Sequence, residues 1–255
     1  MADEPPIVTA ALIIIGNEIL SGRTRDANIP FLAQRLNDLG VRLGEVRIVP
    51  DLEEAIVEAV NDCRAAFDYV FTTGGIGPTH DDITAASIAK AFGLKLVRNP
   101  EAVERLHEHY GADELNVARL RMANTPEGAG LIENPVSKAP GFFVENVFVF
   151  AGVPTIMRAM FENVKHMISG GATMRSRTIA AFLLEGEVAE GLDRLQERYD
   201  DLEIGSYPFL RDGKLGTSVV LRGTASERID EAARELIEHI RYLGGEPVED
   251  SGEAR

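Results

Sequence analysis

The sequence predicts an α/β protein: a doubly wound, mainly parallel sheet followed by a small α+β domain. Three nearly continuous apolar runs, at 8–15, 69–73 and 147–151, each end in a loop that contains glycine. Such runs are typical of parallel strands buried on both faces. The segments between them repeat apolar residues every three or four positions, as amphipathic helices do. Strands that alternate with helices through right-handed crossovers form a sheet with helices on both faces.

The first domain is expected to span residues 1–170 and to alternate between strands and helices. Apolar runs predict its strands at 8–15, 41–49, 69–73, 94–97 and 142–151. The last run is split by Glu145 and Asn146, which predicts a hairpin. Helices are expected to begin near residues 28, 51, 83, 100 and 154. The pattern weakens from 111 to 140, where 114–122 is compatible with a helix, and we expect loops at 16–22 and 124–138.

Polar residues mark several of the expected helix starts. Signals for N-caps stand at Asp51, Asp82, Asn99 and Thr224. A glutamate follows Asp51 and Thr224 three positions later, which is the spacing of a capping box. A proline follows Asn99, as is common at the first position of a helix.

The second domain is expected to span residues 171–255, after a linker of serine and glycine. Strands are predicted at 177–184, 202–210 and 217–221, and helices at 188–199 and 224–243. The order β-α-β-β-α describes a small α+β domain. The tail after Gly245 is acidic, and we expect it to lack regular structure.

Composition and charge restrict the class of protein. With 45% hydrophobic residues, the chain of 255 residues can form a sizeable core. Its 26 basic and 41 acidic residues give a formal net charge of −15, which argues against binding nucleic acids or docking on anionic membranes. The single cysteine, Cys63, excludes an internal disulfide and lies on an apolar helical stripe, which predicts a core position. No apolar run is long enough to span a membrane, so we expect a cytoplasmic protein.

The stretch 72–84 is the strongest candidate for a binding site. Gly74, Gly75 and Gly77 let the backbone approach a ligand closely, and Asp81 and Asp82 follow at the start of a helix. A strand–turn–helix connection in which Asp82 only caps the helix is the plain alternative. The stretch is not a Walker A loop, because no lysine follows the last glycine, and it lacks the third glycine of the dinucleotide fingerprint.

A phosphate bound to this loop would meet backbone amides together with two carboxylates. Carboxylates repel phosphate unless a divalent cation lies between them. The loop therefore predicts a metal-bridged phosphate, with a divalent metal such as Mg²⁺ as the cofactor. The loops after the three apolar runs are expected to form one site, because ligands of open α/β sheets bind at the carboxyl ends of the strands.

Residues 9–167 resemble the molybdopterin-binding domain shared by MogA/MoaB-type proteins, gephyrin, CinA-type competence/damage-inducible proteins and eukaryotic FAD synthetases. The resemblance rests on GNEILSG at 16–22, DAN at 26–28, TGGIGPTHDDIT at 73–84 and APGF at 139–142. The form of the third segment is most similar to the CinA and FAD-synthetase branch. Residues 171–255 are similar to the small KH-like domain of CinA proteins. Because they lack a GXXG loop, we expect that domain to serve packing or dimerisation and to bind no nucleic acid.

The resemblance also implies which residues form the site. It matches Asp82 to the essential acidic residue of the adenylyltransferase branch and Asp26 to its second carboxylate, so both are predicted to be catalytic. Asp81 and Asp82 are the predicted metal ligands, with proton transfer as an alternative role. The predicted ligand-binding residues are Gly16, Glu18, Thr73, Gly74, Gly75, Gly77, Pro78, Thr84, Lys138, Pro140 and Gly141.

Several of these residues have a structural alternative. Asp26 begins a helix and Thr84 stands in a first helical turn, where either can act as a cap. Glu18 is a candidate for binding a ribose or a metal. Lys138 is the nearest candidate cation for a phosphate, and a solvated lysine is its alternative. His80 adjoins the carboxylates and is a weaker candidate for a metal ligand.

The chain departs from the pattern of the resembled family in three places. Family members tend to have a glycine before Ala-Pro-Gly, where this chain has Ser137 and Lys138. They often have Pro-Gly-Val-Pro-Ser-Glu where this chain has AGVPTI at 151–156. Both changes bear on the identity of the ligand. The chain also stops at Arg255 without the nicotinamide-nucleotide amidase domain of CinA-type chains, so we expect no deamidase activity.

Three functions remain in competition. The CinA-type resemblance implies a metal-dependent nucleotide pyrophosphatase that acts on ADP-ribose- or FAD-like dinucleotides. The first alternative is molybdopterin adenylyl transfer, which needs ATP and a pterin pocket. The second is a module of molybdenum cofactor biosynthesis that holds a pterin or nucleotide without chemistry, and the presence of both Asp26 and Asp82 disfavours it. In each case we expect a small-molecule nucleotide or pterin as partner, and a homo-oligomer.

Overall fold

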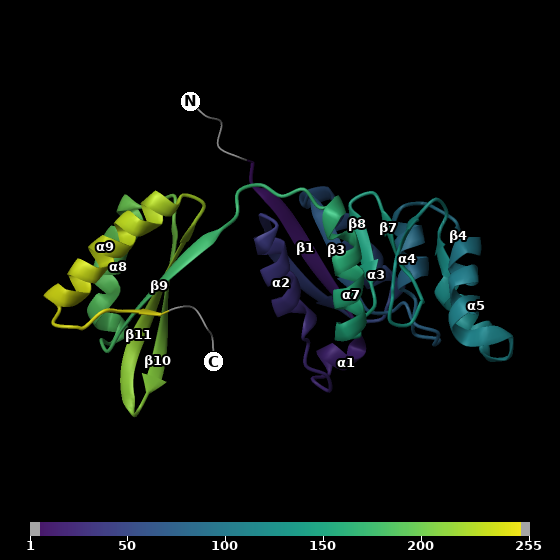
Figure 1. The fold of residues 1–255 in the computed structure, drawn as a ribbon, viewed down its shortest axis with the longest axis horizontal. Helices are drawn as coiled ribbons and strands as arrows, with labels where there is room; N and C mark the ends of the chain where they lie inside the picture. The colour runs from purple at the N-terminus through teal and green to yellow at the C-terminus, as the bar shows by residue number, and fades with distance from the viewer. Residues whose placement is uncertain (1–5, 251–255) are drawn as a thin grey trace. The chain divides into compact units, whose positions relative to one another are not determined.

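The computed structural model describes residues 6–250, including the side chains of all of these except 111–113 and 250. The chain divides into two compact units, Met1–Ala172 and Thr173–Arg255 (Figure 1). The sequence placed this division two residues earlier, at 170/171. Each unit has its own sheet and its own buried core.

The first unit is built on a six-stranded sheet in the order β2-β1-β3-β8-β7-β6. Its strands are β1 (Val8–Ile15), β2 (Val41–Val49), β3 (Tyr69–Thr73), β6 (Gly130–Ile132), β7 (Gly141–Val144) and β8 (Val147–Phe150). The first four in the sheet order are parallel, and β7 and β6 are antiparallel to their neighbours. The predicted α/β class with a mainly parallel sheet is therefore confirmed, as is the hairpin of β7 and β8.

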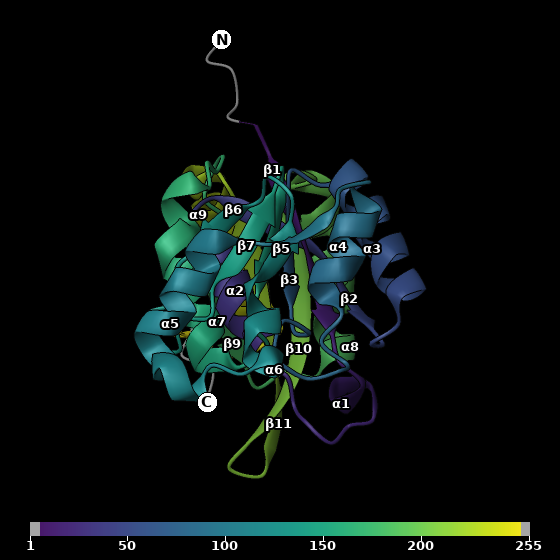
Figure 2. The same cartoon turned by 90° about the vertical axis from the view of Figure 1, so that its right-hand side faces the viewer.

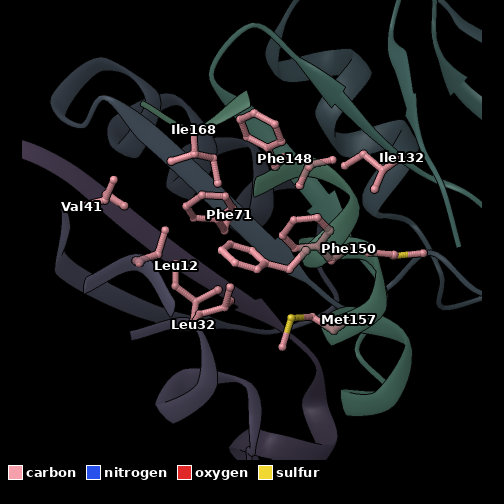
Figure 3. Packing of buried hydrophobic residues seen from close by; sticks show 14 of the residues in the cluster. Leu12, Leu32, Val41, Phe71, Ile132, Phe148, Phe150, Met157 and Ile168 are labelled. Atoms are coloured by element: carbon pink, nitrogen blue, oxygen red, sulfur yellow. The ribbon is translucent and has the colours of Figure 1, made fainter. Parts of the chain in front are cut away.

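Helices cover both faces of this sheet. On one face lie α2 (Asn28–Asp38) and α7 (Pro154–Val164), and on the other lie α3 (Glu53–Ala66) and α4 (Thr84–Ala91), as Figure 2 shows. Alternate residues of each strand supply the two cores, because successive side chains of a strand point to opposite faces. Leu12 and Phe71 pack toward α2 and α7 (Figure 3), while Ile13 and Val70 pack toward α3 and α4. Cys63 is fully buried in the second of these cores, which confirms its predicted position.

A smaller group of elements lies between α4 and β6 in the chain. It consists of β4 (Leu96–Arg98), α5 (Pro100–Glu114), α6 (Val117–Leu120), the 3₁₀ turn η1 (Arg121–Ala123) and β5 (Asn124–Pro126). The strands β4 and β5 pair as a separate antiparallel sheet, and β5 packs on α4. The loop predicted at 124–138 is therefore wrong in part, because β5 and the edge strand β6 lie within it. The loop predicted at 16–22 likewise contains a short helix, α1 (Asn17–Leu20).

Of the four predicted N-caps, only Asn99 caps its helix. Its side chain accepts hydrogen bonds from the amides of Glu101 and Ala102, which begin α5. The carboxylate of Asp51 instead accepts a hydrogen bond from the amide of Asn17, at the start of α1. Among residues 6–250, no side chain caps α3, α4 or the last helix, so the caps predicted at Asp51, Asp82 and Thr224 are wrong. Asp51 has a partner distant in sequence instead, and Asp82 accepts hydrogen bonds from Thr79, three residues before it.

The second unit has the order β-α-β-β-α and adds a strand. It contains β9 (Arg175–Ala181), α8 (Glu185–Arg198), β10 (Glu203–Arg211), β11 (Lys214–Gly223), α9 (Ser226–Tyr242) and β12 (Val248–Asp250). The sheet order is β10-β11-β9-β12, with every neighbouring pair antiparallel. The tail was expected to lack regular structure, but β12 pairs with β9; the rest of the tail, 251–255, lies outside the described residues.

Within residues 6–250, none of the helices combines the length and the apolar composition needed to cross a bilayer.

Candidate functional site

The candidate site lies where the order of the parallel strands reverses. From β1 the chain runs through α2 to β2 on one side of β1, and then through α3 to β3 on its other side. The loops after β1 and β3 therefore diverge from neighbouring strands at the same edge of the sheet. Open α/β sheets bind their ligands at such a switch point.

Three loops meet at Gly74, directly after β3. The Gly74 amide donates a hydrogen bond of 3.1 Å to the carbonyl of Phe150, the last residue of β8. A Cβ added to Gly74 would lie 2.2 Å from the carbonyl oxygen of Ile15, the last residue of β1, and φ here is +101°. A Cβ added to Gly152 would lie 3.3 Å from Cα of Gly74. Only glycine allows this approach, and the expected convergence of the three loops is confirmed.

Thr84 closes the glycine loop onto the first turn of α4. Its hydroxyl donates to the carbonyl of Gly74 at 2.9 Å, and its amide donates to the carbonyl of Gly75 at 3.0 Å. The side chain is fully buried, and a Cβ added to Gly75 would lie 2.1 Å from its Oγ1 atom. Thr84 therefore fixes the glycine loop to the first turn of α4. Thr73 is also buried, and its hydroxyl has no partner within the described part of the chain.

Asp82 lies against the glycine loop rather than at the end of a helix. Its Oδ2 atom accepts a hydrogen bond of 2.7 Å from the amide of Thr79 and a second from the Thr79 hydroxyl. A Cβ added to Gly77 would lie 2.7 Å from the same Oδ2 atom. Asp82 thus closes the turn 79–82 and brings its carboxylate next to the backbone of Gly77.

Asp81 shares the hydroxyl of Thr79 with Asp82. The Thr79 Oγ1 atom lies 2.6 Å from Oδ1 of Asp81, and this hydrogen bond holds the pKa of the Asp81 carboxyl below its usual value. The backbone amide of Asp81 and the charge of His80 act in the same direction. A hydroxyl has one proton and can donate it to one carboxylate at a time. The carboxylates of Asp81 and Asp82 therefore lie next to the same hydroxyl donor, that of Thr79.

A pocket opens beside this turn. It is lined by Gly75, Ile76, Gly77, Asp82, Ala85, Arg121, Met122, Asn124, Pro140 and Phe142. We call this the glycine-loop pocket. The predicted residues Gly75, Gly77, Asp82 and Pro140 come together in it, while Arg121 and Asn124 were missed. They stand where the sequence pattern is weakest, and no local signal marks them.

Asp26 and Glu18 lie at the same edge of the sheet but are not among the lining residues of this pocket. The Oδ1 atom of Asp26 accepts hydrogen bonds from the amides of Asn28 and Ile29, at 2.9 and 2.8 Å, so Asp26 supports the first turn of α2. Asn28 in turn donates to the carbonyl of Gly152 at 2.9 Å. The carboxylate of Glu18 folds over Gly16, where an added Cβ would lie 2.5 Å from it.

Lys138 stands in a loop organised by a buried asparagine. The side chain of Asn134 donates to the Ser137 hydroxyl and the Ala139 carbonyl, and accepts from the amides of Val136 and Ser137. Lys138 takes the left-handed conformation, with φ of +59°. It does not line the glycine-loop pocket, although Pro140 does.

Gly141 begins β7 beside this loop. An added Cβ would lie 2.4 Å from the carbonyl of Val149 on β8, so close strand packing explains this glycine.

The donor set of the turn suits a metal that is shared with a ligand. No group of three or more His, Cys, Asp or Glu side chains within residues 6–250 is arranged to hold a metal ion by itself. Asp81 and Asp82 supply two carboxylates around one hydroxyl, and Mg²⁺ is commonly held by one or two carboxylates together with phosphate oxygens. These residues fit Mg²⁺ only as part of a complex with a phosphate.

Comparison with protein families matches both units. Residues 11–169 match the model described as "Probable molybdopterin binding domain". Residues 173–243 match the model described as "FAD synthase, middle domain". The two matches fall on the two structural units, one on each.

Individual relatives cover the chain to different extents. A protein of Archaeoglobus fulgidus is 34% identical over 89% of this chain and 96% of its own length. A probable FAD synthase of Caenorhabditis briggsae is 32% identical over 92% of this chain, but the match spans only 50% of that protein. The crystal structure of CinA from Thermoplasma acidophilum superimposes with a TM-score of 0.61 at 33% identity, over 63% of this chain and 98% of that one.

Proposed function

Because this chain belongs to the family of probable molybdopterin binding domains, we propose that it is a divalent-metal-dependent nucleotide pyrophosphatase that acts on ADP-ribose- or FAD-like dinucleotides. The likeness of its second unit to the middle domain of FAD synthase, and of nearly the whole chain to a probable FAD synthase, supports a nucleotide as the ligand. Since the chain spans half of that relative, the activity of the longer protein is not transferred to it.

One observation carries the proposal: Asp82 is held in the wall of the glycine-loop pocket by Thr79, against the backbone of Gly77. A carboxylate that only capped α4 would bond to the first amides of that helix, and Asp82 does not. Its second oxygen, Oδ1, is left for a ligand. The alternative of a plain cap therefore loses its physical basis.

The glycine loop and the two carboxylates would have different roles in the hydrolysis of a phosphoanhydride. The backbone amides from Gly75 to Gly77, near the N-terminus of α4, favour an anion and can orient the diphosphate. Asp81 and Asp82 would hold the metal, which supplies positive charge to the phosphate oxygens when bound. In the alternative role, one of these carboxylates would instead accept the proton of the attacking water. The water oxygen forms a bond to one phosphorus, the bridging P–O bond breaks, and AMP leaves with a second phosphate ester.

A second candidate is favoured by the description of the matching family, which names molybdopterin. In that case the same carboxylates serve adenylyl transfer from ATP to the pterin, or the unit holds a pterin without chemistry. In either candidate the ligand is a small molecule that carries phosphate.

Product analysis separates these candidates. The protein is incubated with Mg²⁺ and either ADP-ribose, FAD, or ATP with molybdopterin, and the products are resolved by chromatography. We expect AMP from ADP-ribose or FAD, and its loss in Asp82→Asn. Adenylylated pterin without AMP from the dinucleotides would establish the second candidate instead. Binding without any product would leave a binding module.

A further inference from the structure

We propose that Arg121 is the phosphate-binding cation of the glycine-loop pocket, and that its guanidinium holds one phosphate of the ligand against the amides of the glycine loop. This inference rests on the proposed function in one respect, since it needs a ligand that carries phosphate. It does not depend on whether that ligand is hydrolysed. Arg121 belongs to η1, far in sequence from the glycine loop.

The backbone around Arg121 is held firmly in place. Asn116 caps the preceding helix, α6, by accepting a hydrogen bond from the amide of Arg119. Ala123 is fully buried, and its carbonyl accepts a hydrogen bond of 2.8 Å from the amide of Asn99. The chain then enters β5, which packs on α4, the helix that begins at Thr84, two residues after Asp82. These contacts therefore fix the backbone of Arg121 beside the glycine loop.

The guanidinium of Arg121 is free to bind a ligand. Within the described part of the chain it forms no hydrogen bond, ion pair or aromatic contact. Other arginines of this region are occupied: Arg105 pairs with Glu101, and Arg119 donates to the carbonyl of Glu114 and lies over the ring of Tyr110. Free arginines on an open surface are common, but Arg121 lines a pocket.

Arg121 and Asp82 line the same pocket without pairing. Within residues 6–250, the guanidinium of Arg121 forms no ion pair with a carboxylate, that of Asp82 included. Opposite charges that line one pocket but stay apart leave room for a group that satisfies both. A phosphate can do so, because its oxygens accept hydrogen bonds from the guanidinium and share a metal with the carboxylate.

The chemistry of the guanidinium suits this role better than that of Lys138. Its planar fork donates two parallel hydrogen bonds to a phosphate, whereas an ammonium acts as a point charge. Lys138 lies on a separate loop and does not line the pocket. The cation that sequence reasoning sought near the glycine loop is therefore supplied by a residue nearly forty positions downstream of Asp82.

Equilibrium binding tests the assignment without relying on turnover. Calorimetry is performed in Mg²⁺ with inorganic pyrophosphate, ADP-ribose and adenosine as probes, on the full chain and on Arg121→Ala, Arg121→Lys and Lys138→Ala. We expect Arg121→Ala to weaken pyrophosphate and ADP-ribose by roughly 10- to 100-fold, the effect of one lost charge-assisted hydrogen bond. The affinity of Arg121→Lys for both probes should lie between those of the parent and Arg121→Ala. The affinity of Lys138→Ala should stay within about threefold of that of the parent, because Lys138 does not line the pocket.

Each contrary result has a distinct meaning. Equal binding of pyrophosphate by the parent and Arg121→Ala would overturn the inference, as would a larger loss in Lys138→Ala. An equal loss for adenosine, which has no phosphate, would show that Arg121 only shapes the pocket, and would also overturn it. If the parent binds ADP-ribose through Arg121 but releases no AMP, the inference holds and the proposed pyrophosphatase fails. Arg121 is exposed, so its replacement should leave the thermal unfolding midpoint unchanged.

Discussion

The backbone amide of Thr79 donates a hydrogen bond of 2.7 Å to the carboxylate of Asp82. With this bond the carboxylate lies next to Gly77 and does not cap α4. The Thr79 hydroxyl adds contacts to Asp82 and to Asp81. The four-residue turn 79–82 thus presents two carboxylates beside the glycine loop.

The first prediction concerns Asp82. Asp82→Asn keeps an oxygen that accepts from the Thr79 amide but removes the charge, so AMP release should fall by at least about 100-fold while the fold persists. Asp82→Ala also removes the hydrogen bond, which costs about 1 kcal/mol of a total stability of 5–15 kcal/mol. AMP release and urea unfolding are measured side by side. Asp62→Asn, an exposed carboxylate paired with Arg47, is the matched control and should keep full activity. Parent-like AMP release by Asp82→Asn would remove Asp82 from the chemistry.

The local sequence pattern was sufficient to predict the bounds of several strands. It was not sufficient to predict the hydrogen-bond partners of polar side chains in the loops that follow them. β1, β2 and β3 were predicted with the observed bounds. β1 and β3 are buried parallel strands with nearly continuous apolar residues, whereas β2, at the edge of the sheet, alternates in burial. Asp51 was predicted to be a cap from its spacing, yet it bonds to Asn17, 34 residues away. The hydrogen-bond partner of a side chain depends on which segment the fold brings beside it, and the spacing of residues along the chain does not reveal that segment.

The glycine-loop pocket could likewise be predicted only in part from the sequence. The glycine loop was recognised because three glycines and two aspartates stand together in the sequence. Arg121 and Asn124 reach the pocket only because β4 and β5 pair and β5 packs on α4. Both contacts join residues more than twenty positions apart, in a region where hydrophobic periodicity is weak. The part of the candidate pocket formed by the glycine loop could be predicted from the sequence, and the part contributed by η1 and β5 could not.

The second prediction uses the charge of Asp68. Its carboxylate accepts hydrogen bonds from the amide and the hydroxyl of Thr9, and these bonds lower its pKa. A carboxyl whose pKa is depressed on folding adds stability above its unfolded pKa, about 3.9, and loses it as the pH falls through the folded pKa. The difference in thermal midpoint between the parent and Asp68→Asn should therefore be constant above about pH 5 and shrink below about pH 4. A difference that is as large at pH 3 as at pH 7 would contradict the assignment.

The third prediction concerns the strained backbone at Lys138. A side chain in the left-handed region, with φ of +59° here, costs about 1–2 kcal/mol that glycine does not incur. Lys138→Gly should therefore be more stable than Lys138→Ala by about 1 kcal/mol, after the greater chain entropy of glycine is offset. Urea unfolding of the two variants measures the difference. Equal stability would mean that neighbours such as Asn134 compensate the strain.

The fourth prediction concerns the boundary between the units. Near it, the amide of Ser169 donates to the Tyr69 hydroxyl at 2.9 Å, and the amide of Gly171 donates to the carbonyl of Gly40 at 2.9 Å. A chain that ends after Ala172 keeps both bonds and should fold with the cooperativity of a complete domain. A chain that ends after Ile168 loses both and should unfold at a lower urea concentration. If the two shortened chains unfold alike, the segment 169–172 belongs to neither unit.

The charges of the pocket set up the last prediction. At about 4 Å and an effective dielectric constant near 20, each carboxylate opposes a phosphate charge by about 4 kcal/mol. Arg121 offsets one of the two carboxylates by a similar amount. The N-terminus of α4 adds up to about 2 kcal/mol in favour of the anion. Net repulsion remains, so Arg121 alone does not replace the cation expected beside Asp81 and Asp82.

Removal of the metal should therefore weaken diphosphate binding without abolishing it. We expect EDTA to reduce the affinity for ADP-ribose by at least about tenfold and to stop AMP release, because the two carboxylates then face the phosphates unscreened. In Asp81→Asn/Asp82→Asn, which has no charge at either position, EDTA should change the affinity little. Calorimetry with and without Mg²⁺ measures both effects. Equal affinity of the parent in EDTA and in Mg²⁺ would mean that Arg121 and the loop amides suffice, and the two-carboxylate metal site would have to be abandoned.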